Sequence, residues 1–441
     1  MEPQFRQIPG SIVAPRGFLA SGVFCNIKRI GTGKGSDRGR KRDLALIVSE
    51  VPATVAGMFT TNQICAPPVR LCVERVRAGA AQALVVNSGN ANACTGKQGM
   101  KDALAMTACT AKELHLPATH VLVASTGRIG VALPMDNVRA GIRQAAHLLG
   151  KAPAHAAETV EAIMTSDTQS KQIAVEFQLG DQPVRIGGIC KGAGMIQPGL
   201  SASGERPPAR PLHATMLCFL STDAAIQHAP LQAALQEAVA ESFNRITVDG
   251  DMSTNDTVLI LANGLADNRV LRLRTSDFGL FQAALSHVCL ELARMIVRDG
   301  EGATRFVTVR VTGARTCLEA DAAARAVANS ALVKTSWCGG DPNWGRIIDA
   351  LGYSRARIVE EKVDIGYSAP GSRRILWSLK RGQPAQAAFE RLCATVALKE
   401  FDLHINLNLG PADTLIYAAD LTEEYVDFNK GDVSDPSSLG G

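Results

Sequence analysis

Residues 83–96 read ALVVNSGNANACTG, an apolar and β-branched run that passes straight into a turn rich in Asn and Gly. A short apolar run bounded by turn residues is typical of a buried strand, which we place at residues 83–86. The residues after the turn have a helical period, so a helix is expected at 100–115. This segment therefore predicts a strand–turn–helix unit.

The run VLVASTGRIG at residues 121–130 repeats that arrangement. It predicts a second strand that ends in a polar Ser-Thr-Gly turn at 125–127, followed by a helix at 135–149. Alternation of short strands with helices predicts an α/β or α+β chain rather than an all-α one. The same patterns predict further strands at 172–179, 184–190, 216–221, 306–311 and 402–408, and helices at 231–243 and 277–298.

The composition is that of a folded, soluble protein. Of the 441 residues, 46% are hydrophobic and 20% are charged, which is too apolar for a disordered chain. A formal net charge of +4 over this length does not indicate nucleic-acid binding. The basic cluster at residues 34–42 contains no aromatic residue, so we interpret it as a solvated loop rather than a polyanion site.

Cysteine usage and the N-terminus predict a cytoplasmic protein. The 11 cysteines are scattered and mostly lie in apolar runs, where a thiol behaves as a small hydrophobic group. A reducing compartment is their natural setting. The first residues, MEPQFRQIPG, lack the apolar core of a secretion signal. No uninterrupted apolar run is long enough for a membrane span, so none is expected.

No cofactor is indicated. No Cys-x-x-Cys pair occurs, and no group of Cys and His has the spacing of zinc ligands. GTGKGS at residues 31–36 looks like a phosphate loop, but it lacks the Walker spacing, and no dinucleotide fingerprint appears elsewhere. We therefore expect neither a metal nor a nucleotide cofactor.

Residues 199–212, GLSASGERPPARPL, differ from the rest of the chain. Their prolines exclude a central strand and a helix interior, so we expect an exposed loop. It leads into HATML at 213–217. A Thr hydroxyl becomes a useful nucleophile when its own α-amine, with a pKa of about 7.7–8.0, is free to take its proton. From the residues alone, Thr215 is either such a nucleophile, exposed by a cut before it, or simply the start of a buried strand.

Motifs along nearly the whole chain resemble the ornithine acetyltransferase family, also called glutamate N-acetyltransferase. The lysine motif KGAGMIQP at 191–198, followed by ATML at 214–217, is its signature. The other matching motifs keep the family order: APRGF (14–18), MFTTN (58–62), NSGNANACTG (87–96), STGRIG (125–130), TSDT (165–168), SFNRITVDGDMSTNDTV (242–258), RDGEGATRF (298–306), GGDPNWGRI (339–347) and DLTEEYV (420–426).

The resemblance implies an enzyme that cuts itself between Ala214 and Thr215. Chains 1–214 and 215–441 would then form one intertwined globular unit, expected to assemble as an α2β2 heterotetramer. Thr215 would take the acetyl group of N-acetylornithine as an ester and pass it to L-glutamate. The Thr126 hydroxyl and the Gly127 N–H would stabilise the oxyanion. The implied fold is the family's α/β architecture of layered β-sheets and helices, of the N-terminal-nucleophile kind.

The resemblance also implies which residues bind the zwitterionic substrates. Lys191 would meet an α-carboxylate and Glu301 an ammonium. The other family contacts fall on Thr165, Thr215, Asn429 and Ser434. Seven residues follow Ser434, where family chains normally stop, which puts that position in doubt. Further motif residues are expected to organise the site (Asp249, Asn255) or to serve structure (Asp341, Asn343, Trp344).

Several alternatives stay open. The family's proline usually abuts ATML, whereas here residues 199–212 intervene; we expect a passive surface insertion. A self-processing aminopeptidase or amidase would pass the acyl group to water instead of glutamate. An uncleaved paralogue would act only as a binding protein. The motifs also do not distinguish members that use acetyl-CoA as an additional acetyl donor, a substrate rather than a cofactor.

Overall fold

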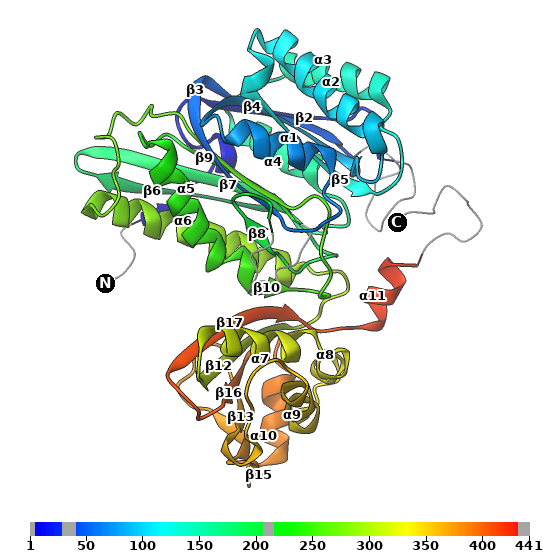
Figure 1. Ribbon diagram of the computed structural model, residues 1–441, viewed down its shortest axis with the longest axis vertical. Helices are drawn as coiled ribbons and strands as arrows, with labels where there is room; N and C mark the ends of the chain where they lie inside the picture. The colour runs from blue at the N-terminus through cyan, green and yellow to red at the C-terminus, as the bar shows by residue number, and fades with distance from the viewer. Residues whose placement is uncertain (1–4, 29–40, 206–215, 431–441) are drawn as a thin grey trace.

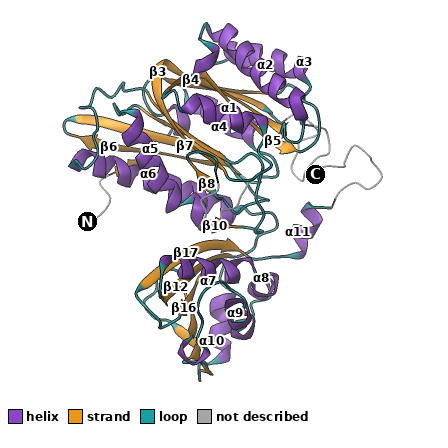
Figure 2. Cartoon of the chain, viewed as in Figure 1, coloured by secondary structure: helices purple, strands orange, loops and turns teal. Residues whose placement is uncertain are grey.

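The structure is a computed structural model that describes residues 5–28, 41–205 and 216–430. Within these ranges the chain forms two β-sheets, one above the other along the long axis of the molecule (Figure 1). Helices pack against both sheets (Figure 2). The predicted α/β architecture of layered sheets and helices is confirmed.

The upper sheet has ten strands, in the order β1-β6-β7-β9-β11-β3-β4-β5, with β2 and β8 also paired to β3. Its strands are β1 (Phe5–Gln7), β2 (Phe18–Val23), β3 (Leu44–Thr60), β4 (Ala80–Asn90), β5 (Val121–Arg128), β6 (Lys171–Leu179), β7 (Gln182–Lys191), β8 (Leu200–Ser201), β9 (Leu217–Thr222) and β11 (Thr257–Ala262).

Strands β9 and β11 run parallel at the centre of this sheet, between the antiparallel β7 and β3. Their side chains alternate between two cores, as the pleat of a strand requires. Leu217 and Phe219 point to a core shared with α1 (Pro67–Val76), α2 (Gly96–Leu114), α3 (Met135–His147) and α4 (Pro153–Ile163). Cys218 and Leu220 point to a core shared with α5 (His228–Ala240) and α6 (Ser276–Arg298).

The lower sheet has seven strands, in the order β10-β17-β12-β16-β13-β14-β15. Its strands are β10 (Ile246–Thr247), β12 (Phe306–Ala314), β13 (Asp364–Ser368), β14 (Leu376–Lys380), β15 (Gln383–Pro384), β16 (Glu400–Asn406) and β17 (Ala412–Ala419). A third core joins one face of it to α7 (Cys317–Asn329), α8 (Ala331–Cys338), α9 (Trp344–Gly352) and α10 (Phe389–Val396). The described chain ends on α11 (Glu423–Phe428), beside the junction of the two parts (Figure 1).

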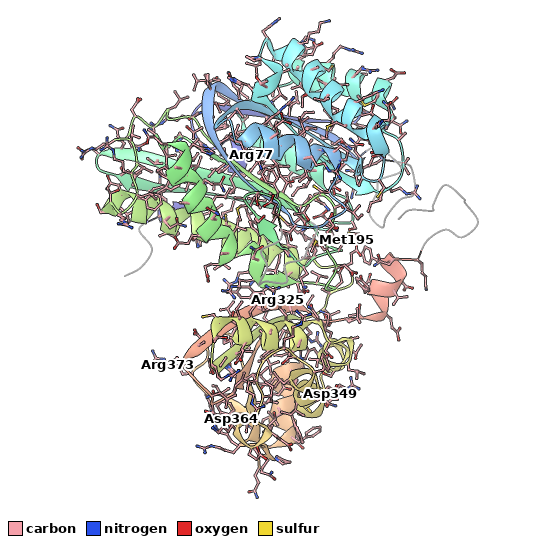
Figure 3. All side chains as sticks on the ribbon, viewed as in Figure 1. Arg77, Met195, Arg325, Asp349, Asp364 and Arg373 are labelled. Atoms are coloured by element: carbon pink, nitrogen blue, oxygen red, sulfur yellow. The ribbon has the colours of Figure 1, made fainter. Side chains whose placement is uncertain are left out.

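The two parts are joined through α6 and the other face of the lower sheet. Phe306 and Tyr417 belong to the core of α5 and α6 rather than to the third core. The Arg294 guanidinium lies 5.0 Å from the Tyr417 ring centroid. At the same junction Arg325, labelled in Figure 3, donates through Nη2 to the Asn244 carbonyl at 2.7 Å. The segment between β9 and β12 therefore contacts both parts of the molecule: α6 packs against the lower sheet, and Asn244 accepts a bond from Arg325 of α7.

Most predicted elements are found close to their expected positions. The strand at 83–86 is the middle of β4, and the helix at 100–115 begins four residues earlier, at Gly96. The predicted helix at 277–298 is α6, whose length and apolar composition alone would also suit a membrane span. Its buried side chains, such as Val288 and Leu292, pack in a core against β6 and β7. Asn343 caps α9 by accepting the Arg346 N–H at 3.1 Å, the structural role expected for it.

The sequence predicted an exposed loop at residues 199–212, and this prediction was wrong for Leu200 and Ser201, which form strand β8. Leu200 is buried, and β8 pairs with the end of β3, where Leu200 lies opposite Thr60. Asn244 also binds the Leu200 backbone, accepting its N–H at 3.0 Å. The prolines that exclude a strand begin only at Pro207, so the first residues remain free to pair with β3. Residues 206–212 lie outside the described ranges.

Candidate active site

The ends of β4 and β5 build the first wall of a cavity. The two strands run parallel in register, from Ala83 opposite Val121 to Gly89 opposite Gly127, so both deliver their carboxyl ends to one edge. Thr126 is buried at this end. Gly127 has φ +129°, and a Cβ there would lie 2.3 Å from the Gly89 carbonyl carbon. Only glycine fits this turn, as expected for an N–H that must be aimed into a site.

Asn255 ties a second loop to this turn. Its Nδ2 donates to the Ala91 carbonyl at 2.7 Å and to the Ser125 carbonyl at 2.8 Å. The side chain is buried, so these bonds satisfy a polar group that would otherwise be costly there. Asn255 lines the cavity and joins its loop to the β4 and β5 turns; the expectation that it organises the site rather than reacts remains a prediction.

Asp249 organises the loop after the lysine motif. Its carboxylate accepts the backbone N–H of Met195 at 2.6 Å and that of Ile196 at 2.8 Å. It also accepts the Tyr425 hydroxyl from α11 at 3.3 Å. Burial raises the pKa of Asp249, although the N–H groups that it accepts lower it again in part. One carboxyl group thus joins the upper sheet to the C-terminal helix.

Lys191 ends β7 inside a buried network of charges. The Lys191 ammonium lies 3.9 Å from Asp167 Oδ2, and both side chains are nearly inaccessible to solvent. Asp167 Oδ1 accepts the Lys171 ammonium and the Gly192 N–H, both at 2.7 Å. Lys171 in turn contacts Asp299. Asp167 also accepts the Thr165 N–H at 2.9 Å, so one carboxylate positions two of the predicted site residues.

The pKa values in this network follow from its pairing. Burial alone would raise the pKa of Asp167, but the Lys171 and Lys191 ammonium groups and the Gly192 N–H outweigh it and hold the pKa well below its usual range. Burial alone would lower the pKa of Lys171, but Asp167 and Asp299 outweigh it and raise that pKa. The pairs therefore remain charged, which keeps Lys191 beside a permanent anion.

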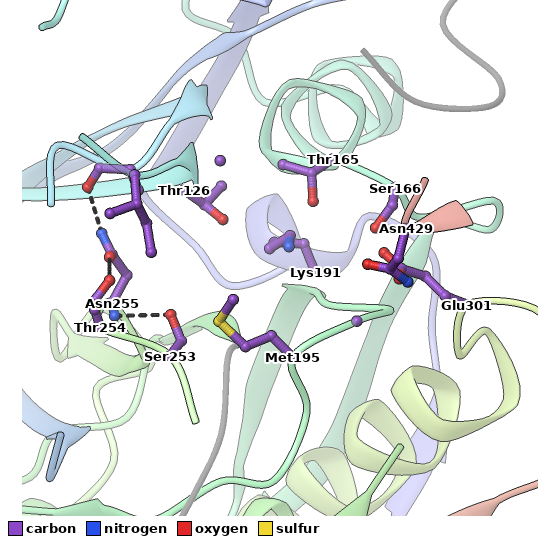
Figure 4. A pocket seen from close by; sticks show the side chains of 14 residues that line it. Thr126, Thr165, Ser166, Lys191, Met195, Ser253, Thr254, Asn255, Glu301 and Asn429 are labelled. Carbon is purple, nitrogen blue, oxygen red and sulfur yellow. Dashed lines mark hydrogen bonds between the residues drawn. The ribbon is translucent and has the colours of Figure 1, made fainter. Parts of the chain in front are cut away.

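Glu301 faces Lys191 across the cavity (Figure 4). Its N–H donates to the Ala193 carbonyl at 2.9 Å, which fixes the loop to the lysine motif. A Cβ at Gly194 would lie 2.5 Å from the Glu301 carboxyl carbon, so the second glycine of KGAG makes room for this side chain. Asn429 Nδ2 donates to Glu301 Oε2 at 2.9 Å.

These residues share one cavity of about 180 Å³. It carries a buried cation, Lys191, and an anion, Glu301, and therefore suits a small molecule with charges of both signs. The structure brings together six of the predicted site residues on its lining: Thr126, Gly127, Thr165, Lys191, Glu301 and Asn429.

The remaining predicted site residues, Ala214, Thr215 and Ser434, lie outside the described ranges. Met216, the residue after Thr215 in the chain, is described and buried. Its N–H donates to Asp256, and its carbonyl accepts the Thr257 N–H at 3.0 Å. The next residue, Leu217, lies opposite Lys191 in the pairing of β7 with β9. The start of β9 is therefore held beside the lysine of the cavity.

Reasoning from the sequence missed the buried carboxyl groups around the cavity. Asp167, Asp299 and Asp256 stand inside quoted motifs, but nothing in their spacing marks them as buried. Asp167 and Asp299 are 132 residues apart, and both contact Lys171. The one available signal was their position, within three residues of Thr165, Asn255 or Glu301.

Comparison with known proteins places the chain in a family. A sequence profile described as the ArgJ family matches residues 22–431. The arginine biosynthesis bifunctional protein ArgJ of Symbiobacterium thermophilum is 45% identical over 96% of this chain and 98% of its own length. That of Caldanaerobacter subterraneus is 43% identical over the same shares.

Two solved structures are also similar in sequence. The ArgJ protein of Bacillus halodurans is 38% identical, with a TM-score of 0.41, over 45% of this chain and 98% of that one. The ornithine acetyltransferase of Mycobacterium tuberculosis, complexed with ornithine, is 37% identical, with a TM-score of 0.41, over 45% of this chain and all of that one. The family profile and the full-length relatives decide the assignment: this chain belongs to the ArgJ family.

Proposed function

We propose that this chain transfers the acetyl group of N-acetylornithine to L-glutamate through an acetyl ester on Thr215, as a step of arginine biosynthesis. The observation that carries the proposal is the single cavity in which the Thr126–Gly127 turn faces a buried Lys191 and a Glu301. Full-length relatives at 40–45% identity are named arginine biosynthesis bifunctional proteins, which supports acetyl transfer in that pathway.

The nucleophile would be produced by self-cleavage. The Thr215 hydroxyl oxygen attacks the Ala214 carbonyl carbon, the C–N bond breaks, and the hydroxyl proton passes to the Thr215 nitrogen. Water then hydrolyses the ester, which leaves an Ala214 carboxylate, a free Thr215 hydroxyl and an α-amine beside it. That amine is the base available to the hydroxyl. Because β9 and β11 lie between β7 and β3, chains 1–214 and 215–441 would stay in one sheet after the cut.

Acetyl transfer then follows in two balanced steps. The Thr215 oxygen attacks the acetyl carbonyl of N-acetylornithine, the amide C–N bond breaks, and ornithine leaves with the hydroxyl proton on its amine. The amine of glutamate next attacks the ester carbonyl, the new C–N bond forms, the C–O bond to Thr215 breaks, and N-acetylglutamate leaves while the amine proton returns to the Thr215 oxygen. Each step passes through a tetrahedral oxyanion, for which the Thr126 hydroxyl and the Gly127 N–H would be the donors.

The charged walls of the cavity would orient both substrates. Lys191 would bind the α-carboxylate of either substrate and Glu301 the side-chain ammonium of N-acetylornithine, with Thr165 and Asn429 as polar contacts. Ser434 remains a proposed contact outside the described residues. We also propose acetyl-CoA as a second donor for glutamate, no cofactor, an α2β2 assembly and a cytoplasmic setting.

The test begins with purified protein. On a denaturing gel we expect two bands, with the larger chain beginning Thr-Met-Leu-Cys. Acetylornithine should release ornithine rapidly only when glutamate is present; equal release without glutamate would indicate an amidase. Adding acetyl-CoA in place of acetylornithine tests the second donor.

Variants of Thr215 test the nucleophile. Thr215→Ala should stay uncut and inactive, whereas Thr215→Ser should keep part of both functions because it keeps a hydroxyl. Thr222→Ala is the matched control, since Thr222 ends the same strand and bonds the Arg185 carbonyl at 2.7 Å, away from the cavity. Full activity in a single-band, uncut protein would contradict the proposed mechanism.

A further inference from the structure

Asp256 carries a buried oxygen atom that has no hydrogen-bond partner among residues 5–28, 41–205 and 216–430. The residue lies just before β11 and is fully buried. Its Oδ1 accepts the N–H of Met216 at the start of β9, and its Oδ2 has no hydrogen-bond partner. An unsatisfied buried acceptor costs roughly 1–3 kcal/mol, so native structures seldom keep one without a use.

The carboxyl group at the opposite end of β9 shows the ordinary arrangement. Asp223 follows the last residue of the strand and is equally buried. Its Oδ1 accepts the Arg185 N–H at 2.8 Å, and its Oδ2 accepts the Arg16 N–H at 3.2 Å. Two carboxyl groups thus flank one strand, and among the described residues only the one at the cavity end has an oxygen without a hydrogen-bond partner.

Asp256 also differs from Asp167, the other carboxyl group that interacts with Lys191. Asp167 accepts two N–H groups and contacts two ammonium groups, so its pKa is lowered. Burial raises the pKa of Asp256 well above its usual range, and the Met216 N–H and the Lys191 ammonium only partly oppose it. Lys191 is the one charged group acting on Asp256 within the described ranges. Burial thus favours the protonated form of Asp256, and a further cation beside it would favour the ionised form.

We propose that Asp256 is a positioning residue for the amino-terminal end of β9: Oδ1 holds the Met216 amide, and Oδ2 is kept for the amino group that cleavage creates on the preceding residue. The inference rests on the proposed self-cleavage. Before the cut, the nitrogen of residue 215 is an amide without basicity. After the cut it is an amine one residue from the N–H that Asp256 already binds, and the carboxyl proton passes to it to form an ammonium–carboxylate pair.

The pair has a consequence for the pH dependence of acetyl transfer. A carboxylate beside the amine raises the pKa of the amine, by about one unit or more for a close pair. The amine must be neutral to accept the hydroxyl proton. Removing the carboxylate therefore shifts the acidic limb of the kcat/KM profile to lower pH.

Asp256→Asn tests this, because the amide oxygen can still accept the Met216 N–H while the second oxygen is lost. We expect a shift of the acidic limb by about one pH unit to lower pH. Asp223→Asn, at the far end of the same strand, should leave the limb in place. An unshifted limb in Asp256→Asn, or an equal loss of activity at every pH, would overturn the proposal.

A second measurement applies if Asp256→Asn fails to fold or to cut. Infrared spectra of the uncut Thr215→Ala precursor and of the cut unsubstituted enzyme are compared at neutral pH. We expect one protonated-carboxyl band to disappear on cleavage; an unchanged band would overturn the proposal. An unsubstituted protein that never cuts itself would instead contradict the proposed function, and this inference with it.

Discussion

Both halves of the molecule bury lysines, and the surroundings of Lys171 in the upper part and Lys334 in the lower part shift the lysine pKa in opposite directions. In the upper part, Lys171 lies between Asp167 and Asp299, which raise its pKa despite burial. In the lower part, Lys334 of α8 donates to the Ala419 carbonyl. Burial lowers the pKa of Lys334 to about 8, because Asp249 and Asp420 raise it only in part.

The difference in pairing corresponds to a difference in role: the ion pairs of Lys171 lie beside the cavity, whereas Lys334 connects elements of the lower part. Charges buried against charges hold Lys191 and Thr165 in place around the cavity. The lysine buried against a carbonyl joins a helix to the end of β17. The lower part reaches the cavity through its connections: Asp420 accepts the Thr304 N–H at 2.8 Å, and α11 then carries Asn429 to Glu301.

Lys171→Met should have the largest effect. It leaves two buried carboxylates without their partner, which typically costs about 3–5 kcal/mol of unfolding free energy. Urea titration measures it. Lys380→Met is the control in the lower part, because its pair with Asp364 at 2.9 Å is half exposed and is expected to lose at most about 1 kcal/mol. Equal losses of unfolding free energy in Lys171→Met and Lys380→Met would contradict the expected difference between the buried and the half-exposed ion pair.

Gly127→Ala tests the turn of β5. The new Cβ would meet the Gly89 and Asn90 backbone at 2.3 and 2.5 Å, so the N–H must move away from the cavity. We expect kcat to fall about 10²–10³-fold, the cost of losing one oxyanion donor. Gly180→Ala, at φ +59° with open space around it, should lower stability but not kcat. A wild-type kcat in Gly127→Ala would contradict the proposed role of the Gly127 N–H as an oxyanion donor.

Lys334→Met tests the lysine of the lower part by its pH dependence. Above pH 8 the buried lysine loses its proton in the folded chain before it does so in the unfolded chain, whose pKa is near 10.5. The unfolded state then binds more protons, so wild-type stability relative to Lys334→Met should rise from pH 8 to 10.5, by on the order of 3 kcal/mol. Urea titrations of both proteins across that range measure it. Lys171, with its raised pKa, should show no such gain.

Asn429→Ala should have the smallest effect. It removes the bonds from Nδ2 to Glu301 Oε2 and to the Tyr425 carbonyl at the exposed edge of the cavity, each worth about 0.5–1.5 kcal/mol. We expect KM for acetylornithine to rise about 2–10-fold with kcat nearly unchanged. Asn137→Ala is the control, because Asn137 is a half-buried asparagine away from the cavity whose Nδ2 donates to the Asn26 carbonyl at 3.3 Å. A fall in kcat alone would place Asn429 in the chemistry rather than in binding.

The sequence predicted those strands and helices whose hydrophobic period and turn residues lie within one short segment. β4, α2, β5 and α3 each show one period followed by turn residues, and all four were found. β3 was not predicted, since Pro52 interrupts its pattern. In the structure its pairing with β4 shifts between Val48 and Ala53, and that irregularity accommodates the proline inside a 17-residue strand.

The sequence by itself determined the family, the strand–turn–helix units and six residues of the cavity, because these depend on motifs and on neighbours along the chain. Only the tertiary structure decided which charges meet. Asp167, Lys171 and Asp299 are brought together from distant segments, and one of the two oxygens of Asp256 is left free. The energy of a buried charge depends on what surrounds it in space, and no local spacing encodes that.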